Sequence, residues 1–337
     1  MTIADLIAAL ETIAPLHLAE EWDNVGLLIG APESPLVGPV LLTIDLTEAV
    51  MDEAKGMKAS AIVAYHPPIF AAIKRVVGGE AAGAGERVVY SAARAGIAVY
   101  SPHTALDACA GGVTDWLAEG LLSARGKGGD VRALQPALVP AATQEVKIVT
   151  FVPHEHVETV RAALASAGAG LIGEYELCSF SHHGVGTFRG KPGTRPAAGS
   201  GAVGQFEQVT EHRLEMVCSR RALGLALATL RQLHPYEEPA IDVYALEAKP
   251  DRATGAGRRI TLDHPCTLDE LTARLKKHVG ATAVQVGRAT SGSVDRIGVV
   301  PGAGGALAEA AAADGCQVFV TGEMKHHEVR AALSRGM

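Results

Sequence analysis

The sequence is poor in aromatic residues, in cysteine and in positive charge. Phe, Trp and Tyr make up 4% of its 337 residues, and the formal net charge is −7. The densest basic stretch, RLKKH at 274–278, has the spacing of a solvated helix face, so binding to the backbone of DNA or RNA is not expected. The five cysteines are scattered and form no CxxC pair, which indicates a reduced, cytoplasmic protein.

Long apolar runs and targeting signals are missing as well. No window reaches the roughly 18 uninterrupted apolar residues of a membrane-spanning helix, so no membrane partner is expected. The first residues lack a basic region followed by an apolar core, so no signal peptide is expected. Hydrophobic residues nevertheless make up 48% of the chain, which is enough to build the cores of two globular domains.

Strands and helices alternate in the first third of the chain. An amphipathic pattern predicts a helix over 3–13, with Thr2 as its N-cap. Apolar runs predict strands within 39–47, 59–68 and 95–107, and helical patterns separate them. This order is typical of an α/β fold with a mostly parallel sheet that helices cover on both faces.

The pattern changes in the middle of the chain and then returns. Residues 126–145 are rich in Gly, Pro and polar residues, which predicts a linker. Residues 146–247 follow the order strand, helix, strand, helix, strand, which is typical of a small ferredoxin-like α+β module. The sequence therefore predicts one discontinuous α/β core, 1–125 with 256–337, that an inserted module interrupts.

Two stretches of the later chain have weaker patterns. Residues 180–188 (FSHHGVGTF) and 184–204 are rich in glycine and are predicted to form a long loop. Residues 247–258 form a charged seam between the insert and the returning core. After it the pattern predicts a helix over 267–280 and a short strand at 283–288.

Three predicted strands end in side chains of the metal-binding type. They are His66 after the second strand, His103 and Asp107 after the third, and Glu323, His326 and His327 near the C-terminus. In open α/β sheets, ligands bind beyond the carboxyl ends of the strands, so these side chains are candidates for one shared site. Histidine combined with carboxylates suits Zn, Mn, Fe or Ni.

Each of these histidines also has a purely structural interpretation. A histidine at a strand exit is often a hydrogen-bonded residue without a ligand, and spacing alone leaves the two interpretations open. The adjacent His182 and His183 are equally typical of exposed imidazoles and of ligands. The segment HPYEEPA at 234–240 favours a rigid turn over a metal site.

Five motifs then occur in a fixed order along the chain. They are EEWDNVGLLIG (20–30), TIDLTEAVMDEA (43–54), AYHPPIF (64–70), YSPHTALD (100–107) and VTGEMKHHEVRAA (320–332). With them the chain resembles the Nif-three-like dinuclear-metal family, whose members are often named GTP cyclohydrolase I type 2 homologues. The inserted region is similar to the P-II/CutA-like module of the family's long form.

The resemblance implies a fold, an assembly and a set of site residues. It implies a three-layer core of two similar α/β halves, interrupted by the ferredoxin-like insert, and a toroidal homohexamer with up to two divalent metals per subunit. It makes His66 and Asp107 metal ligands and places His103 beside them as a catalytic proton carrier. Tyr65 stands where many members have a further histidine, and a neutral phenol is a poorer ligand than an imidazole.

The end of the chain departs from the family pattern. Members usually continue into a His-x-x-x-Glu motif that supplies two more ligands, whereas this sequence ends at Met337. Either the chain is truncated or the site is built differently, with His327 or Glu323 as substitutes.

The resemblance leaves two kinds of function open. The first is a metal-dependent hydrolase that acts on a nucleotide or another phosphate-containing small molecule. The alternative is a non-enzymatic regulatory, scaffold or metal-handling protein, in which the insert senses a small molecule.

Overall fold

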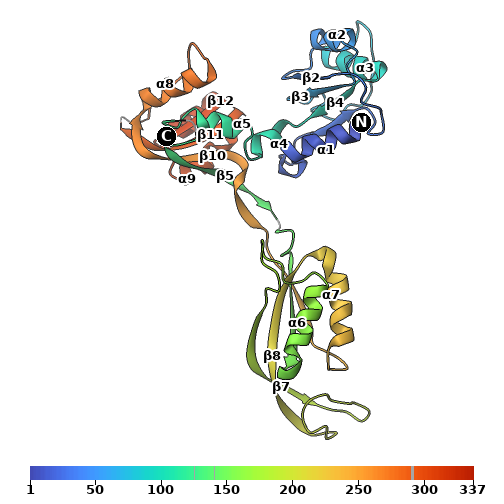
Figure 1. Cartoon of the computed structure of the whole chain (residues 1–337). Helices are drawn as coiled ribbons and strands as arrows, with labels where there is room; N and C mark the ends of the chain where they lie inside the picture. The colour runs from blue at the N-terminus through green and yellow to red at the C-terminus, as the bar shows by residue number, and fades with distance from the viewer. Residues whose placement is uncertain (125, 140, 290–291) are drawn as a thin grey trace. The chain divides into compact units, whose positions relative to one another are not determined.

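The computed structural model describes residues 1–124, 126–139, 141–289 and 292–337 (Figure 1). Position 125, the predicted end of the first core segment, and position 140 of the predicted linker lie outside these ranges. The described chain forms two compact units, 1–137 with 251–337 (unit 1) and 138–250 (unit 2).

The first sheet of unit 1 is mostly parallel, as the strand-helix alternation predicts. Its strands, in the order β1-β4-β3-β2, are β1 (Gly26–Ile29), β2 (Val40–Thr43), β3 (Ala61–Ala64) and β4 (Ala98–Ser101). Strands β2, β3 and β4 run parallel, and β1 pairs antiparallel with β4. The carboxyl ends of β2, β3 and β4 therefore lie at one edge of the sheet.

Helices cover both faces of this sheet because alternate strand residues point to opposite sides. Ala61 of β3 packs against α1 (Ile3–Ile13), and the next residue, Ile62, packs against α2 (Glu48–Gly56) and α3 (Ala84–Ala95). Thr2 begins α1 with the predicted capping box. Three short helices complete this part: η1 (Leu16–Leu18), α4 (His103–Ala108) and α5 (Val113–Glu119).

The second sheet of unit 1 corrects two predictions about connecting segments. In the order β12-β11-β10-β5, it contains β5 (Gly129–Val139), β10 (Lys249–Thr267), β11 (Ser293–Ala303) and β12 (Val318–Glu323). Most of the predicted linker 126–145 is thus strand β5, and the predicted seam 247–258 lies largely in strand β10. Their glycines misled the prediction. Gly255 in β10 has φ 132° and lies so close to the backbone of β5 that a Cβ there would be 2.1 Å from the carbonyl oxygen of Gln135.

The remaining elements of unit 1 follow the sequence pattern more closely. They are α8 (Leu268–Val279), η3 (Gly304–Leu307), α9 (Ala308–Ala313) and α10 (His326–Ser334). The strand predicted at 283–288 is wrong, because these residues form no regular element. The valines at 284 and 286, with Gln285 between them, imitate the alternation of a strand, but this segment pairs with no strand.

Unit 2 is an antiparallel sheet with two helices. Its elements are β6 (Val146–Pro153), η2 (His154–His156), α6 (Val157–Ser166), β7 (Phe180–Arg189), β8 (Phe206–Cys218), α7 (Arg220–Leu233) and β9 (Ile241–Ala245). The strand order is β7-β8-β6-β9, and every neighbouring pair is antiparallel. The predicted loop at 180–188 is therefore wrong: this segment is strand β7, which pairs with β8 over its whole length. Glycines at 184 and 186 hid the alternation.

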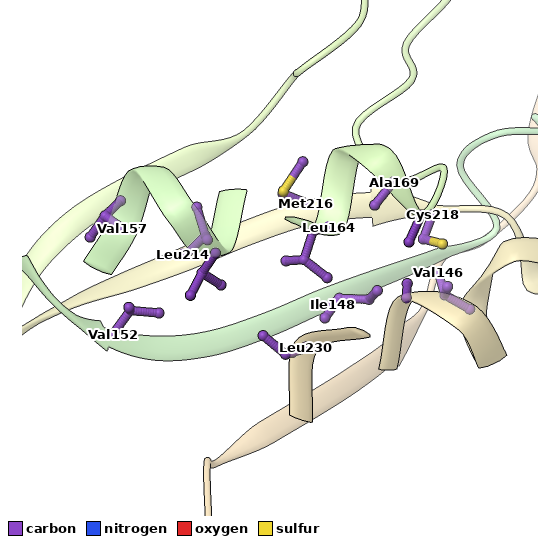
Figure 2. Packing of buried hydrophobic residues seen from close by; sticks show 13 residues of the cluster. Val146, Ile148, Val152, Val157, Leu164, Ala169, Leu214, Met216, Cys218 and Leu230 are labelled. Atoms are coloured by element: carbon purple, nitrogen blue, oxygen red, sulfur yellow. The ribbon is translucent and has the colours of Figure 1, made fainter. Parts of the chain in front are cut away.

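The core of unit 2 lies between one face of this sheet and both helices (Figure 2). Ile148 and Leu214 point from the strands toward Leu164 of α6 and Leu230 of α7, and each of these side chains is at most 1% exposed. The alternate residues of β6 and β8, such as Phe151 and Arg213, point to the opposite face. Unit 2 thus has one helix-covered face and one face that its helices leave free.

The structure bears on two predictions, that the chain has no membrane-spanning helix and that its cysteines are reduced. No helix within the described ranges is long and apolar enough to cross a membrane. All five cysteines are free, and four of them are buried.

Candidate metal centre

The carboxyl ends of β3 and β4 bring the two predicted strand-end histidines together. The two strands run parallel with Val63 beside Tyr100, and the hydroxyl of Ser101 donates to the carbonyl of Tyr65 at 2.8 Å. The rings of His66 and His103 lie with their centroids 5.5 Å apart and almost perpendicular, at 82°. Strand ends that are 37 residues apart in the sequence thus form one site.

A carboxylate orients each of the two imidazoles. The Nδ1 atom of His66 lies 2.8 Å from Oδ1 of Asp45, and the Nδ1 atom of His103 lies 2.8 Å from Oδ1 of Asp23. An ionised carboxylate only accepts hydrogen bonds, so Nδ1 is the donor in both rings, and in the neutral form of each ring Nε2 is left as an acceptor. Metal-binding histidines in proteins are oriented in the same way.

Asp107 lies one helical turn after His103 in α4 and is paired with Tyr65. The hydroxyl of Tyr65 donates to Oδ1 of Asp107 at 2.5 Å. Burial raises the pKa of the Asp107 carboxyl above its usual value, although the hydrogen bond from Tyr65 opposes this. Burial and the neighbouring Asp107 charge also raise the pKa of Tyr65, so the phenol stays protonated. Tyr65 therefore orients Asp107.

Asp23 is a fully buried carboxylate held in its charged form. Its side chain is 0% exposed, and this burial alone would raise its pKa. Hydrogen bonds from the Thr104 hydroxyl, from His103 and from the backbone N–H groups of Thr104 and Asn24 outweigh burial and lower the pKa. His103 itself has φ 27°, a conformation that residues other than glycine rarely adopt.

Two exposed aromatic rings flank His103. Trp22 is 61% exposed and Phe70 is 57% exposed, and their ring centroids lie 6.3 Å and 6.5 Å from that of His103. The Nδ2 group of Asn24 donates to the carbonyl of Ile69 at 2.6 Å and so fixes the loop that carries Phe70. The site therefore combines proton-accepting groups with an apolar wall.

Sequence reasoning missed several of these residues. Asp45 follows strand β2, so the strand-end argument that found His66 could have found it too. Asp23 and Trp22 lie in the connection before β1, where no period or strand end marks them. Only their place in the EEWDN motif indicated a role.

The third predicted strand end is not part of this site. Glu323 ends β12, which belongs to the second sheet, and His326 and His327 begin α10. In the described chain these three side chains make no hydrogen bond, ion pair or ring contact with His66, His103 or Asp107. The structure therefore brings together two of the three candidate strand ends.

The donors at the site fit a divalent metal in kind, but they do not form a complete ligand set. Two imidazoles with free Nε2 atoms and a desolvated carboxylate are suitable donors for Zn, Mn, Fe or Ni. No group of three or more His, Cys, Asp or Glu side chains within the described residues has the spacing of a preformed metal site.

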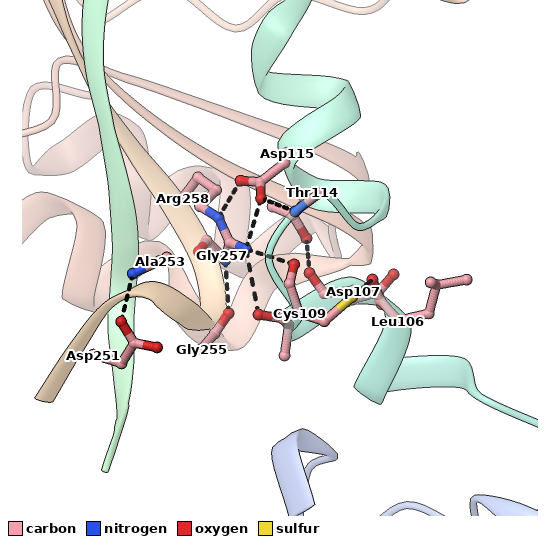
Figure 3. A network of polar contacts seen from close by, with 12 residues as sticks. Leu106, Asp107, Cys109, Thr114, Asp115, Asp251, Ala253, Gly255, Gly257 and Arg258 are labelled. Atoms are coloured by element: carbon pink, nitrogen blue, oxygen red, sulfur yellow. Dashed lines mark hydrogen bonds and ion pairs between the residues drawn. The ribbon is translucent and has the colours of Figure 1, made fainter. Parts of the chain in front are cut away.

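The segment after Asp107 is fixed by a buried arginine from β10 (Figure 3). Arg258 is 1% exposed and forms an ion pair with Asp115 of α5. Its guanidinium also donates to the backbone carbonyls of Gly255, Gly257, Ala108 and Cys109, at 2.8, 2.9, 3.3 and 3.0 Å. The hydroxyl of Thr114 donates to the carbonyl of Asp107 at 2.7 Å. These contacts hold the end of α4, and with it Asp107.

The other histidine-rich segments lie in unit 2. His183 of β7 pairs across the strands with His212, their ring centroids lie 4.0 Å apart, and Nδ1 of His154 lies 2.9 Å from Nε2 of His212. Burial, followed by the neighbouring imidazoles, lowers the pKa of His212. The buried His234 accepts from the backbone of Tyr236 and lies 3.1 Å from the carbonyl of Phe151, which confirms the rigid turn predicted at 234–240.

Comparisons with known proteins place these features in a family. The family described as Duf34/NIF3 (NGG1p interacting factor 3) matches residues 1–337. A Bacillus subtilis (strain 168) protein named GTP cyclohydrolase 1 type 2 homolog is 35% identical over 333 residues, which cover 98% of this chain and 85% of the relative. A solved Bacillus cereus protein related to NIF3 has 34% identity and a TM-score of 0.66, over 100% of this chain and 86% of that one. The solved Staphylococcus aureus protein SA1388 has 28% identity and a TM-score of 0.74, over 100% and 85%.

Proposed function

Because the chain belongs to the Duf34/NIF3 family, we propose that it is a metal-dependent hydrolase of a nucleotide or another phosphate-containing small molecule. One observation carries the proposal: two imidazoles, each oriented by a carboxylate through Nδ1, lie side by side at the strand edge where α/β proteins bind ligands. The name of the Bacillus subtilis relative supports a nucleotide as substrate.

Each residue of the site has a distinct role in this proposal. The divalent metal would be held by Nε2 of His66 and by the carboxylate of Asp107. Asp45 orients His66, and Tyr65 orients Asp107. The metal supplies Lewis acidity toward a phosphate or carbonyl oxygen. His103 accepts at Nε2 the proton of the attacking water and passes it to the leaving group, while Asp23 stabilises the imidazolium that exists between the two transfers.

The aromatic wall selects the substrate in this proposal. The rings of Trp22 and Phe70 have centroids 5.9 Å apart and are both more than half exposed, so a flat heterocyclic ring can pack against them. The phosphate or carbonyl group of the same molecule would then reach His103.

Metal analysis combined with a turnover screen tests the proposal. The full chain is reconstituted with Zn, Mn, Fe(II) or Ni, its metal content is measured, and GTP and a panel of phosphoesters are offered. We expect His66→Ala to lose metal and turnover together, and His103→Ala to keep the metal and lose turnover. His326→Ala is the matched control, because His326 begins α10 beside the second sheet and makes no contact with His66, His103 or Asp107, and it should change neither. Metal content that His66→Ala leaves unchanged would contradict the assignment.

A second candidate is a metal-handling protein without turnover. The incomplete ligand set favours this candidate, because a metal that is bound by a small number of donors is held loosely and can be released. Metal that binds through His66 and exchanges rapidly, with no turnover on any offered substrate, would favour this candidate over the hydrolase.

We further propose that unit 2 is a ferredoxin-like module of the P-II/CutA type. Its strand order β7-β8-β6-β9, with α6 after the first strand and α7 after the third, supports this. We also propose a cytoplasmic, toroidal homohexamer on the basis of the family resemblance. Light scattering on the full chain tests this assembly against the mass of six 34.8 kDa chains.

A further inference from the structure

Unit 2 contains a cavity that is separate from the candidate metal centre. Its volume is about 600 Å³, within the range of about 300–1,000 Å³ that is usual for small-molecule sites. It lies between strand β7, the chain that follows β7, and the turn before β9. Phe151 and Arg213, which point away from the helices, are among its lining residues.

A buried carboxylate without a cationic partner faces this cavity. Glu211 is 9% exposed, and its Oε1 accepts a hydrogen bond from the Tyr236 hydroxyl at 2.5 Å. Within the described residues no Lys, Arg or His side chain forms an ion pair with Glu211. A buried charge without a counter-charge is costly, so a ligand cation here would replace the missing partner.

A glycine leaves room for the second carboxylate oxygen of Glu211. A Cβ at Gly186 would lie 2.2 Å from Oε2, whereas a Cβ at Gly184 on the same strand would meet nothing within 4 Å. Neither glycine has a positive φ, so backbone conformation does not explain them. Gly186 thus keeps Oε2 free to receive a ligand.

Arg195, in the chain that follows β7, lines the same cavity and has the opposite charge to Glu211. It is exposed, and its guanidinium group forms no hydrogen bond or ion pair in the described chain. A guanidinium binds a carboxylate through two parallel hydrogen bonds. Arg213 of the lining is paired with Glu215, so the remaining charged side chains at the cavity are Arg195 and the three glutamates Glu211, Glu237 and Glu238. A lining with both signs of charge and no excess of positive charge favours a zwitterion over a polyanion.

The surface between the charges is apolar. The guanidinium of Arg213 lies 5.7 Å from the ring centre of Phe151 and is paired with Glu215, so it fixes this ring and is itself engaged. Phe188 and Val185 also line the cavity. We propose that the cavity binds a zwitterionic, dipeptide-sized molecule, with its ammonium group at Glu211, its carboxylate at Arg195, and its apolar part over Phe151.

Calorimetric titration of the full chain with leucyl-phenylalanine and two blocked forms tests this assignment. The N-acetyl form removes the ammonium group and the C-terminal amide removes the carboxylate, and each should bind at least about tenfold more weakly. Equal binding of all three forms would overturn the proposal, as would tighter binding of AMP than of the dipeptide. Absence of any heat up to about 5 mM dipeptide would also overturn it.

Matched variants locate the ligand. We expect Glu211→Gln and Gly186→Ala each to weaken binding of leucyl-phenylalanine at least about tenfold, which is about 1.4 kcal/mol. Glu207→Gln on the same strand and Gly224→Ala in α7, where a Cβ would meet nothing within 4 Å, lie outside the lining and should leave it unchanged. Far-UV circular dichroism establishes that all four variants fold. Folded Glu211→Gln and Gly186→Ala proteins that bind with unchanged affinity would show that the ammonium group does not lie at Glu211.

Discussion

Replacing Arg258 by methionine should destabilise unit 1 much more than replacing any exposed arginine of the same unit. Arg258→Met removes a guanidinium that is 1% exposed and leaves Asp115 and four backbone carbonyls without their donor. Methionine fills much of the vacated volume, so a large cavity does not form. The decrease in the free energy of unfolding therefore measures the contribution of the polar network and not that of the packing.

The magnitude follows from what remains unpaired. Removing one partner of a buried ion pair costs about 3–5 kcal/mol, because the other charge stays buried. The Asp115 side chain is 25% exposed and keeps a hydrogen bond from the N–H of Gly111 at 2.7 Å, so solvent and this bond relieve part of the cost. We expect a loss of about 3 kcal/mol, at the lower end of that range.

Tryptophan fluorescence during urea unfolding is a suitable assay. Both tryptophans of the chain, Trp22 and Trp116, lie in unit 1, so the signal reports that unit alone. With a slope of about 3 kcal/mol per M, the unfolding midpoint should fall by about 1 M. The slope itself should not change, because the surface exposed on unfolding is the same.

Arg252→Met is the matched control for this prediction. The Arg252 side chain is 62% exposed and pairs with Asp130, and an exposed pair of this kind contributes at most about 1 kcal/mol. A midpoint for Arg258→Met that falls no further than that of Arg252→Met would refute the idea that the buried network holds the end of α4.

Three further predictions concern single sites. Asp107→Asn should raise the melting temperature at pH 7 by roughly 2–4 °C, which corresponds to about 1 kcal/mol, and should abolish metal binding. The pKa of Asp107 is raised in the folded protein, so its charged form lowers the stability above that pKa, and asparagine removes this charge. Calorimetry with and without metal measures both effects, and a lowered melting temperature would contradict the prediction. Because the pKa of His212 is lowered in the folded protein, the stability that its neutral form gives to unit 2 is complete above about pH 6.5 and is lost as the pH falls through the lowered value. In His212→Gln the melting temperature of unit 2, followed by circular dichroism between pH 7.5 and 5, should therefore fall less with acid. A pH profile equal to that of the original protein would argue against this. Gly112→Ala would place a Cβ 1.9 Å from the carbonyl oxygen of Leu106 and should destabilise unit 1 by more than about 2 kcal/mol. A Cβ at Gly56 in α2 would meet nothing within 4 Å, so Gly56→Ala should stabilise the same unit by about 0.5–1 kcal/mol. Equal midpoints of urea unfolding for the two variants would contradict this contrast.

Local sequence patterns predicted an element correctly where residues within one short segment determine its structure. The helix over 3–13 began at the predicted capping box because Thr2 and Asp5 satisfy each other's backbone N–H groups within four residues. The buried strand before His66 was visible as an apolar run. By contrast, β7 and β5 failed as predictions, because a glycine inside a strand is indistinguishable in the sequence from a loop glycine.

The candidate site shows the same division. The strand-end argument found His66, His103 and Asp107, because parallel strands must end at one edge of a sheet. It also added His326 and His327, whose strand belongs to a different sheet, since strand order is set by pairing and is not written locally.

The sequence by itself determined the alternation of strands and helices, the strand-end histidines and, through its motifs, the family. Those features depend on neighbours within a few residues or on residue types at fixed spacing. Only the tertiary structure decided that Asp45 and Asp23 orient the two imidazoles, that Tyr65 holds Asp107, and that Glu211 faces a cavity without a counter-charge. These pairings join residues that lie 21 to 80 positions apart or depend on an absent partner, and the chain fixes them only when its sheets have formed.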